Sequence, residues 1–360
     1  MRSSGTKGYQ GYRGRGGGSG RKLLAAALVV LLLVAGGLLF AQRYVVYEAD
    51  GSLRFDWPWS RRTQQPQEPQ QSASPPAQGL EIVIRPPAEP DPPPVEEDPE
   101  PHARELNASV LQGGVENALL ALPEGTNALA VRVKNSTGEL LYNSQLTGAI
   151  EAQAAVGSSI ARASIEALTA SDYYVIARIA ALHDSLYSFA HMTDAAVQQL
   201  QYRGYIWYAP DSTFYLAPEK PLARQYLVDI AVECAELGFD ELLFDEFTYP
   251  AWGRLDNIKT DERTVTMTEA LTQLAVELRE AMEPYGVRVS VVMDAETVRY
   301  GSNLYSGQSV EAFAQVFDRI YVPVTAEQTA EIAAVLAAYP AEFVPITAQP
   351  PAAGPYLIAP

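Results

Sequence analysis

The sequence predicts an α/β protein, a (β/α)8 TIM barrel, preceded by an N-terminal transmembrane helix and a disordered proline-rich linker. Three observations lead to this prediction. An uncharged apolar run lies near the N-terminus, a proline-rich stretch follows it, and eight strand-like runs alternate with helical patterns afterwards. Strands that alternate with helices are typical of a parallel sheet, and a length of roughly 250 residues is usual for one barrel.

The first two segments are a basic, glycine-rich tail over residues 1–22 and a signal anchor over residues 23–41. Residues 23–40 contain no charged or polar side chain, and a helix of about 27 Å crosses the hydrocarbon layer. Residues 1–43 hold seven lysines and arginines and no acid, which places the N-terminus in the cytoplasm. A cleaved signal peptide is the alternative, but Leu39 at position −3 of a cut after Ala41 is not small. We therefore expect a single-pass protein of the cell membrane, bound to the lipid bilayer, with an extracytoplasmic barrel.

Two further segments separate the anchor from the barrel. Residues 42–60 include a candidate hairpin, because Asp50-Gly51 lies between two apolar runs. Residues 61–103 form the linker, and 12 of the 26 prolines lie between positions 66 and 101, mixed with Gln and Glu. Such a composition cannot bury a core and stays extended. The linker is thus expected to act as a spacer.

Residues 104–360 are predicted to form the barrel. The eight expected strands are 106–109, 128–134, 173–180, 241–247, 288–294, 319–324, 342–348 and 356–359. The connection between the last two is too short for a full helix. Tyr226, Ile230 and Cys234 repeat at a spacing of four between Pro221 and Gly238, which predicts an amphipathic helix. Cys234 is therefore expected to be a core residue and not a reactive thiol.

Composition excludes several classes of function. Residues 44–360 hold 19 lysines and arginines against 43 acids, so no affinity for nucleic acid is expected. Cys234 is the only cysteine, and three histidines accompany it, which makes a zinc cluster unexpected. No phosphate-binding loop or Ser/His/Asp arrangement stands out. We expect chemistry without a metal ion or cofactor.

Alternation along the strands predicts which side chains point into the barrel. In strand 128–134 the apolar residues alternate, which leaves Arg132 and Lys134 inside. The same pattern places Arg178 inside on the next strand, Asp245 and Phe247 on one face of strand 241–247, and Ser290 and Asp294 inside on strand 288–294. Charged side chains therefore gather near the carboxyl ends of the strands, where enzymes of this fold have their active sites.

Three segments and one motif resemble a known family. They are YVIARI at 174–179, YLVDIAVE at 226–233, ELGFDELLFD at 236–245, and Tyr249-Pro250. Together they resemble a bacterial glycosyl hydrolase barrel family that was long catalogued as a domain of unknown function and is often membrane-anchored. The likeness covers residues 105–360 and is strongest over 173–250. It implies a carbohydrate polymer as the partner.

The chain also departs from that family. Where the family usually has Asp-Tyr-(Ile/Val)-Arg-Phe-Pro, residues 245–250 read DEFTYP, so an arginine is missing. Where the family often has an aspartate on strand two, this chain has Arg132. The last strand also lacks the tryptophan usual in the family. These differences leave open a barrel that binds glycans, or organises the envelope, without catalysis.

Glycoside hydrolysis needs two carboxyl groups. By analogy with related barrels, Asp245 is expected to be the nucleophile, with Arg178 favouring its ionised form. The general acid would then be Asp294 or Glu296. Glu246 is the alternative acid, although strand alternation turns it away from Asp245. A purely structural ion pair between Asp245 and Arg178 is the competing interpretation.

The long segment 183–218 is rich in aromatic residues, and long connections at this end of a barrel carry binding residues. Trp207 is the first candidate for stacking on a sugar, with Tyr249 and Trp252 as further candidates. The alternative is that these rings only pack their loop. Asp184 either caps the loop or lines the cleft. The inward bases Arg132, Lys134 and Arg178 complete the expected substrate contacts.

Overall fold

The computed structural model describes residues 45–47, 53–55, 100–202, 204–260 and 263–359. The chain divides into two compact units, Met1–Asp91 and Pro92–Pro360. The predicted tail and anchor, and the linker up to residue 99, lie outside the described residues. In the part that is described, no helix is both long and apolar enough to cross a membrane.

In the first unit, β1 (Val45–Tyr47) and β2 (Leu53–Phe55) pair antiparallel, with Val45 opposite Phe55. The two strands flank Asp50-Gly51, the place where the sequence predicts a hairpin. The connecting residues 48–52 are outside the described part.

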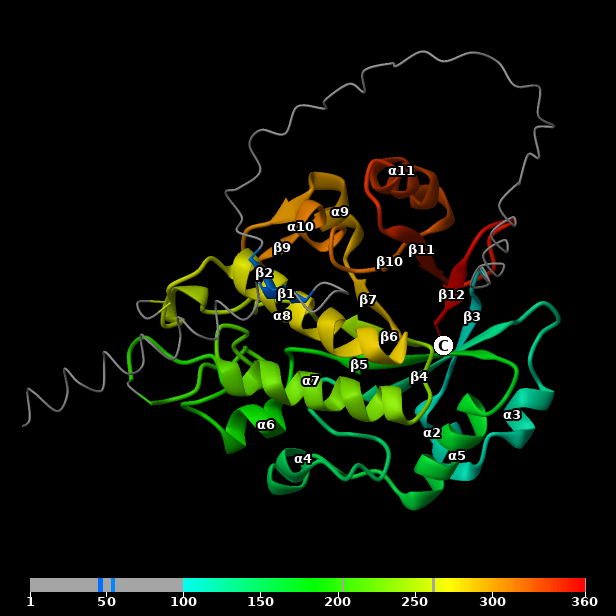
Figure 1. Cartoon of the computed structure of the whole chain (residues 1–360), viewed down its shortest axis with the longest axis horizontal. Coiled ribbons are helices and arrows are strands. Elements are labelled where there is room, and N and C mark those ends of the chain that lie inside the picture. The colour runs from blue at the N-terminus through cyan, green and yellow to red at the C-terminus, as the bar shows by residue number, and fades with distance from the viewer. Residues whose placement is uncertain (1–44, 48–52, 56–99, 203, 261–262, 360) are drawn as a thin grey trace, which may run out of the picture. The chain divides into compact units, whose positions relative to one another are not determined.

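The second unit contains a closed barrel of eight parallel strands (Figure 1). Each strand pairs with the next one in the barrel along the chain, and the last pairs with the first through Tyr356 and His102. This confirms the predicted barrel. The strands are β3 (His102–Leu106), β4 (Ala128–Lys134), β5 (Tyr174–Ala180), β6 (Glu241–Asp245), β7 (Arg288–Val292), β10 (Arg319–Pro323), β11 (Glu342–Thr347) and β12 (Tyr356–Ile358).

Helices connect most of the strands. They are α2 (Ala108–Gly113), α3 (Glu116–Leu120), α4 (Thr147–Glu151), α5 (Ser159–Thr169), α6 (Ser185–Ala190), α7 (Pro221–Glu236), α8 (Met267–Met282), α9 (Ala295–Tyr300), α10 (Val310–Phe313) and α11 (Ala326–Leu336). Single 3-10 turns occupy Leu255–Asn257 and Glu283–Tyr285, and β8 (Ser302–Asn303) pairs with β9 (Gln308–Ser309). Residues 348–355, between β11 and β12, form no helix, as their short length predicts.

The core has two layers that follow the predicted alternation. A small cluster of buried residues inside the barrel includes Ala130 and Ile176, whereas their neighbours Val131 and Ala177 belong to the larger cluster between strands and helices. Cys234 on α7 is fully buried in that larger cluster, as predicted. Small side chains along β3 and β4 leave room inside the barrel for larger groups from the other strands.

The first predicted strand is wrong in position. The sequence predicts a strand over 106–109, but β3 is His102–Leu106 and residues 108–113 are helical. The Asn107 side chain accepts a hydrogen bond from Ser109 N and caps α2. An asparagine in this role starts a helix, so the strand ends before it.

Two side-chain directions also differ from strict alternation. A register shift lies between Arg132 and Lys134: Arg132 pairs with Arg178, but Lys134 pairs with the outward-facing Ile179. The extra residue of a bulge changes which side of the sheet the following side chains face, so Lys134 does not point inside. Phe247 lies in the outer core and not inside, because β6 ends at Asp245.

Candidate active site

Four charged side chains from adjacent strands meet at the carboxyl ends of β3 to β6. Arg178 Nε and Nη2 donate to Asp245 Oδ2 and Oδ1 at 2.6 and 3.1 Å, and Arg178 Nη1 donates to Glu105 Oε2. Arg132 Nη1 lies 3.0 Å from Asp245 Oδ2, and its Nη2 lies 3.6 Å from Glu105 Oε1. We call Glu105, Arg132, Arg178 and Asp245 the mouth network. Its two-point guanidinium–carboxylate contact is of the strong, oriented kind.

The mouth network is mostly buried, and one of its members is partly exposed. The side chains of Glu105, Asp245 and Arg178 are 5%, 9% and 11% exposed, whereas Arg132 is 28% exposed. Burial acts to lower the pKa of the Arg178 guanidinium, but the facing carboxylates of Asp245 and Glu105 outweigh burial and raise it. Arg178 is therefore a fixed positive charge, and Arg132 is the member that a ligand can reach.

Glu246 follows Asp245 and points to a different set of neighbours. Its backbone is left-handed, with φ of 49°, a conformation that costs a non-glycine residue on the order of 1–3 kcal/mol and that often occurs at functional sites. Ser136 Oγ donates to Glu246 Oε1 at 3.1 Å, and His183 Nδ1 lies 3.4 Å from Oε2. Burial acts to raise the pKa of Glu246, but His183, Ser136 and Lys134 outweigh it and lower the pKa. The left-handed turn thus brings a second carboxylate among residues that follow β4 and β5.

Lys134 and Asp184, both predicted as site residues, form an ion pair in the interior. Lys134 Nζ lies 2.9 Å from Asp184 Oδ2 and also donates to Ala180 O at 2.7 Å. Asp184 Oδ1 accepts from Tyr187 N and caps α6. A Cβ at Gly138, where φ is +102°, would lie 2.1 Å from Asp184 Oδ1, so glycine is needed there. Both charged side chains are 0% exposed, and Asp184 is a capping residue.

Asp294 and Glu296, the predicted general acids, are engaged elsewhere. Asp294 Oδ1 accepts from Thr297 N at 2.8 Å and Oδ2 accepts from Thr297 Oγ1 at 2.5 Å, so Asp294 caps α9. Glu296 is 75% exposed and lies 3.3 Å from Arg299. Among the described residues, no hydrogen bond or ion pair joins either of them to the mouth network.

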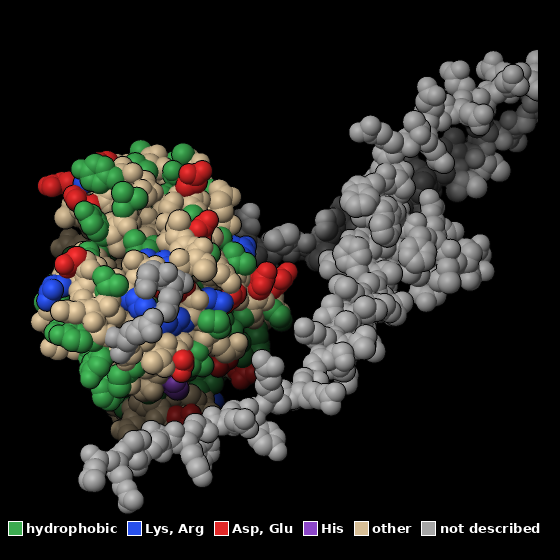
Figure 2. Space-filling view, turned by 90° about the vertical axis from the view of Figure 1, so that its left-hand side faces the viewer, with side chains coloured by type: hydrophobic (Ala, Val, Ile, Leu, Met, Phe, Trp, Pro, Cys, Tyr) green, Lys and Arg blue, Asp and Glu red, His purple; other side chains and the backbone are tan. Residues whose placement is uncertain are grey.

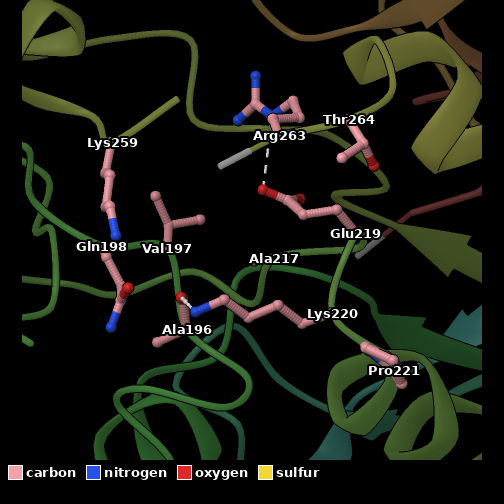
Figure 3. Close-up of a pocket in the computed structure, with 10 residues that line it drawn as sticks. All are labelled: Ala196, Val197, Gln198, Ala217, Glu219, Lys220, Pro221, Lys259, Arg263 and Thr264. Atoms are coloured by element: carbon pink, nitrogen blue, oxygen red, sulfur yellow. Dashed lines mark hydrogen bonds and ion pairs between the residues drawn. The ribbon is translucent and has the colours of Figure 1, made fainter. Parts of the chain in front are cut away.

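Tyr249 joins two of the connections at the mouth. Its hydroxyl donates to Glu219 Oε2 at 2.5 Å, and the Arg263 guanidinium lies 4.7 Å from the centre of its ring. Arg263 Nε is also 3.4 Å from Glu219 Oε1, and both residues line a cavity of about 210 Å³ (Figure 3). These contacts hold the β5–α7 and β6–α8 connections together. Because Tyr249 is 1% exposed, its ring offers no surface on which a sugar could stack.

The two tryptophans differ in exposure. Trp207 is 1% exposed and its Nε1 donates to Arg254 O at 3.0 Å, so its ring packs the loop. Trp252 is 48% exposed and is open to a ligand. Figure 2 shows the side of the molecule that carries these connections, where lysine and arginine side chains gather near the middle and acids lie mainly toward the edge.

Sequence reasoning missed Glu105, Ser136 and His183. Glu105 was recoverable, because Ala103 and Glu105 alternate with Arg104 and Leu106 once the strand is placed correctly. Ser136 and His183 carry no recognisable pattern. They are brought to Glu246 by the connections that follow β4 and β5.

The fold and this mouth define a (β/α)8 barrel with two neighbouring carboxylates at the end of its fourth strand. Residues 115–324 match a family described as "Putative glycosyl hydrolase domain". The chain belongs to this family, which confirms the resemblance seen in the sequence.

The chain is also similar to several solved structures. A hypothetical protein from Ruminiclostridium thermocellum ATCC 27405 is 23% identical, with a TM-score of 0.43, over 51% of this chain and 91% of that chain. The glycoside hydrolase domain of PgaB (BpsB) from Bordetella bronchiseptica is 15% identical, with a TM-score of 0.42, over 61% and 74%. A GH20 exo β-N-acetylglucosaminidase from Vibrio harveyi is 10% identical, with a TM-score of 0.46, over 69% and 41%. No curated protein matches the chain.

Proposed function

We propose that this protein is a glycoside hydrolase that acts on a cell-envelope or extracellular polysaccharide, with Asp245 as the reacting carboxylate. The observation that carries the proposal is the position of Asp245 at the carboxyl end of β6, where two arginines bind it and one of them, Arg132, is partly exposed. The two-point contact with Arg178 and the contact with Arg132 fix the orientation of the Asp245 carboxylate. A glycosidase nucleophile needs a carboxyl group held in a defined position beside the sugar.

Glu246 is the best candidate for the second carboxyl group. It lies next to Asp245 in the chain but contacts Ser136 and His183, so the two carboxylates have different surroundings. Different surroundings allow two neighbouring carboxyl groups to take different roles. The pKa of Glu246 is lowered in the free protein, so the general-acid role requires Glu246 to take up a proton when the substrate binds. Asp294, which accepts a hydrogen bond at each of its oxygens, is less suited to donate one.

The place of action is part of the proposal and rests on the sequence. The apolar run at residues 23–40, with basic residues before it, favours a single-pass anchor with the barrel outside the cytoplasm. The proline-rich linker would then separate the barrel from the bilayer. Fractionation of cells, followed by protease treatment of intact cells, would test this. Protection of the barrel from external protease in intact cells without an outer membrane or other barrier contradicts it.

The chemistry is tested by two matched variants of the full chain. Asp245→Asn should lower the release of reducing sugar from a susceptible polysaccharide by roughly 10³-fold or more, because it removes the reacting group. Asp294→Asn should keep nearly full activity, because asparagine also caps a helix. Both would be measured on a panel of bacterial polysaccharides. If Asp245→Asn is as active as the parent, Asp245 is not the nucleophile, and a loss of activity in Asp294→Asn would restore Asp294 as the acid.

A second candidate function is a glycan-binding barrel without catalysis. The observation that favours it is Arg132, which stands where the family often has an aspartate and contacts Asp245 at 3.0 Å. A carboxylate held by two guanidinium groups is less free to attack. Saturable glycan binding that is unchanged in Asp245→Asn, together with no turnover of any polysaccharide, would support this second function.

A further inference from the structure

A second pocket lies apart from the mouth network, between the β5–α7 and β6–α8 connections. Its volume is about 220 Å³. The residues that line it are Gln199, Trp207, Tyr208, Pro210, Arg254 and Asn257. None of them belongs to the mouth network or contacts Glu246 among the contacts described above.

The walls of this pocket are held in place by contacts between the two connections. Trp207 Nε1 donates to Arg254 O at 3.0 Å. Gly253 has φ of +94°, and a Cβ there would lie 2.7 Å from Pro210 Cδ, so the two segments approach as closely as a glycine allows. A pocket whose walls are already ordered loses little entropy when a ligand binds.

The side chains of the pocket suit a sugar. Tyr208 is 57% exposed, and an aromatic face of this kind can cover the apolar C–H side of a pyranose ring. Arg254 is exposed and forms no ion pair with any described residue, and its guanidinium offers several N–H donors. The amide of Asn257 adds both a donor and an acceptor. An aromatic wall with a few converging polar groups is the usual composition of a small-molecule site.

Two further exposed aromatic side chains lie on the same segment as Tyr208. Tyr202 and Tyr205 are 56% and 65% exposed, and their ring centres are 6.0 Å apart. Several large exposed aromatic side chains on one segment are unusual for a surface without a partner. Exposed rings at more than one position fit a chain of sugars better than a single monosaccharide.

Packed rings connect the pocket to the catalytic carboxylates. Trp207 meets Tyr215 edge to face with centres 6.2 Å apart, and Tyr215 stacks on His183 at 4.4 Å. His183 Nδ1 in turn lies 3.4 Å from Glu246 Oε2. The pocket and the surroundings of Glu246 are therefore joined by packed side chains, most of them from the same connection.

We infer that this pocket is a secondary subsite that binds one sugar ring of the polysaccharide, with Tyr208 stacked on the ring and Arg254 bound to its hydroxyl or carboxylate groups. The inference rests on the proposed function for its substrate class. It adds that the substrate is a polymer held at two places, at the mouth and at the Tyr208 pocket.

The test is a binding measurement with the full-length Asp245→Asn protein, in which turnover does not interfere. Chitohexaose, cellohexaose and hexagalacturonate would be titrated by calorimetry. At least one should bind, and Tyr208→Ala added to Asp245→Asn should weaken its binding about tenfold, a change of about 1.4 kcal/mol. Tyr208→Phe keeps the ring and should bind within about twofold, which separates stacking from misfolding.

Arg254→Gln and a control variant complete the design. Weaker binding of hexagalacturonate alone would assign Arg254 to a carboxylate, and weaker binding of a neutral hexamer would assign it to hydroxyl groups. The control is Tyr285→Ala, because Tyr285 is also exposed but precedes β7 at the opposite end of the barrel. It should leave binding unchanged.

Two results would overturn the subsite. One is that none of the three hexamers binds at millimolar concentration, and the other is that Tyr208→Ala binds as tightly as its Asp245→Asn background. The proposed function fails on a different result, namely full turnover by Asp245→Asn. The two failures are therefore distinguishable.

Discussion

Two networks of arginine and carboxylate close the opposite ends of the barrel interior. At the amino ends of the strands, Arg319 Nη1 lies 2.6 Å from Glu241 Oε2 and Arg319 Nε lies 2.5 Å from Glu342 Oε2. The Tyr174 hydroxyl also donates to Glu241 Oε2 at 3.0 Å. We call Tyr174, Glu241, Arg319 and Glu342 the base network. These four are the first residues of β5, β6, β10 and β11.

The two networks use the same chemistry but differ in how deeply the central ion pair is buried. The side chains of Arg319 and Glu241 are 2% and 0% exposed, whereas those of Arg178 and Asp245 are 11% and 9% exposed. Each network also has one more exposed member, Glu342 at 38% and Arg132 at 28%. A fully buried ion pair cannot contact a ligand. Removing one partner leaves the other charge buried without compensation, which destabilises the protein. The comparison leads us to expect that the base network serves stability and, under the proposed function, that the mouth network serves chemistry, the division usual for this fold.

The largest effect on stability is expected when the base network is broken. Arg319→Met would leave Glu241 buried without its cation, and the free energy of unfolding should fall by about 3–5 kcal/mol. The activity of the molecules that remain folded should not change. Urea unfolding and activity per folded molecule would check this. If a fully folded Arg319→Met protein loses activity, the base network also affects catalysis, and the proposed difference between the two networks is wrong.

Breaking the mouth network should lower activity strongly and stability only slightly. In Arg178→Met, Arg132 still contacts Asp245 and Glu105, so the loss of stability should be smaller, about 1–2 kcal/mol. Activity should fall by roughly 10²-fold or more, because the Asp245 carboxylate loses its two-point contact. The same two assays apply. If Arg178→Met costs as much stability as Arg319→Met and no activity, the mouth network is structural.

The smallest effect concerns pH. Because the pKa of Glu246 is lowered in the folded protein, the stability that it contributes is present above the ordinary glutamate pKa. That contribution is lost as the pH falls through the lowered value. His183→Gln removes the principal cause of the lowering and leaves burial, which raises the pKa. As the proposed general acid, Glu246 must be protonated for activity, so the alkaline limb of the pH–activity profile should move to higher pH. An unmoved alkaline limb would show that Glu246 does not control it.

Much of the barrel follows from periodicity, but the ends of its strands do not. The bounds of β4 and the inward direction of Arg178 are confirmed, because both lie within regular alternation. The predicted inward direction is wrong for Lys134 and Phe247. A bulge interrupts β4 before Lys134, and the left-handed Glu246 follows the end of β6 before Phe247. Such interruptions depend on tertiary contacts that one sequence does not display.

The same reason limits prediction of the site. Active sites of barrels lie where strands end, which is where alternation stops being informative. Asp245 was identifiable because it closes a regular strand, whereas Glu105 was hidden by a misplaced boundary and His183 by an irregular connection. Alternation and analogy with related barrels indicated Asp294, but its role as a helix cap depends on the local contact with Thr297.

The uncovered closure between β11 and β12 has a mechanical consequence. β12 pairs with β11 through two residues and with β3 through three, and no helix spans residues 348–355. The chain that precedes His102 enters the barrel at β3. We call the pairing of β12 with β11 and β3 the β12 seam. Under the proposed anchoring, any tension between the membrane and a bound polysaccharide would reach the barrel at this seam, where β12 is paired through only two and three residues. A hydrolase pulled by its own substrate would therefore yield first at the β12 seam, well away from the carboxylates of the fourth strand.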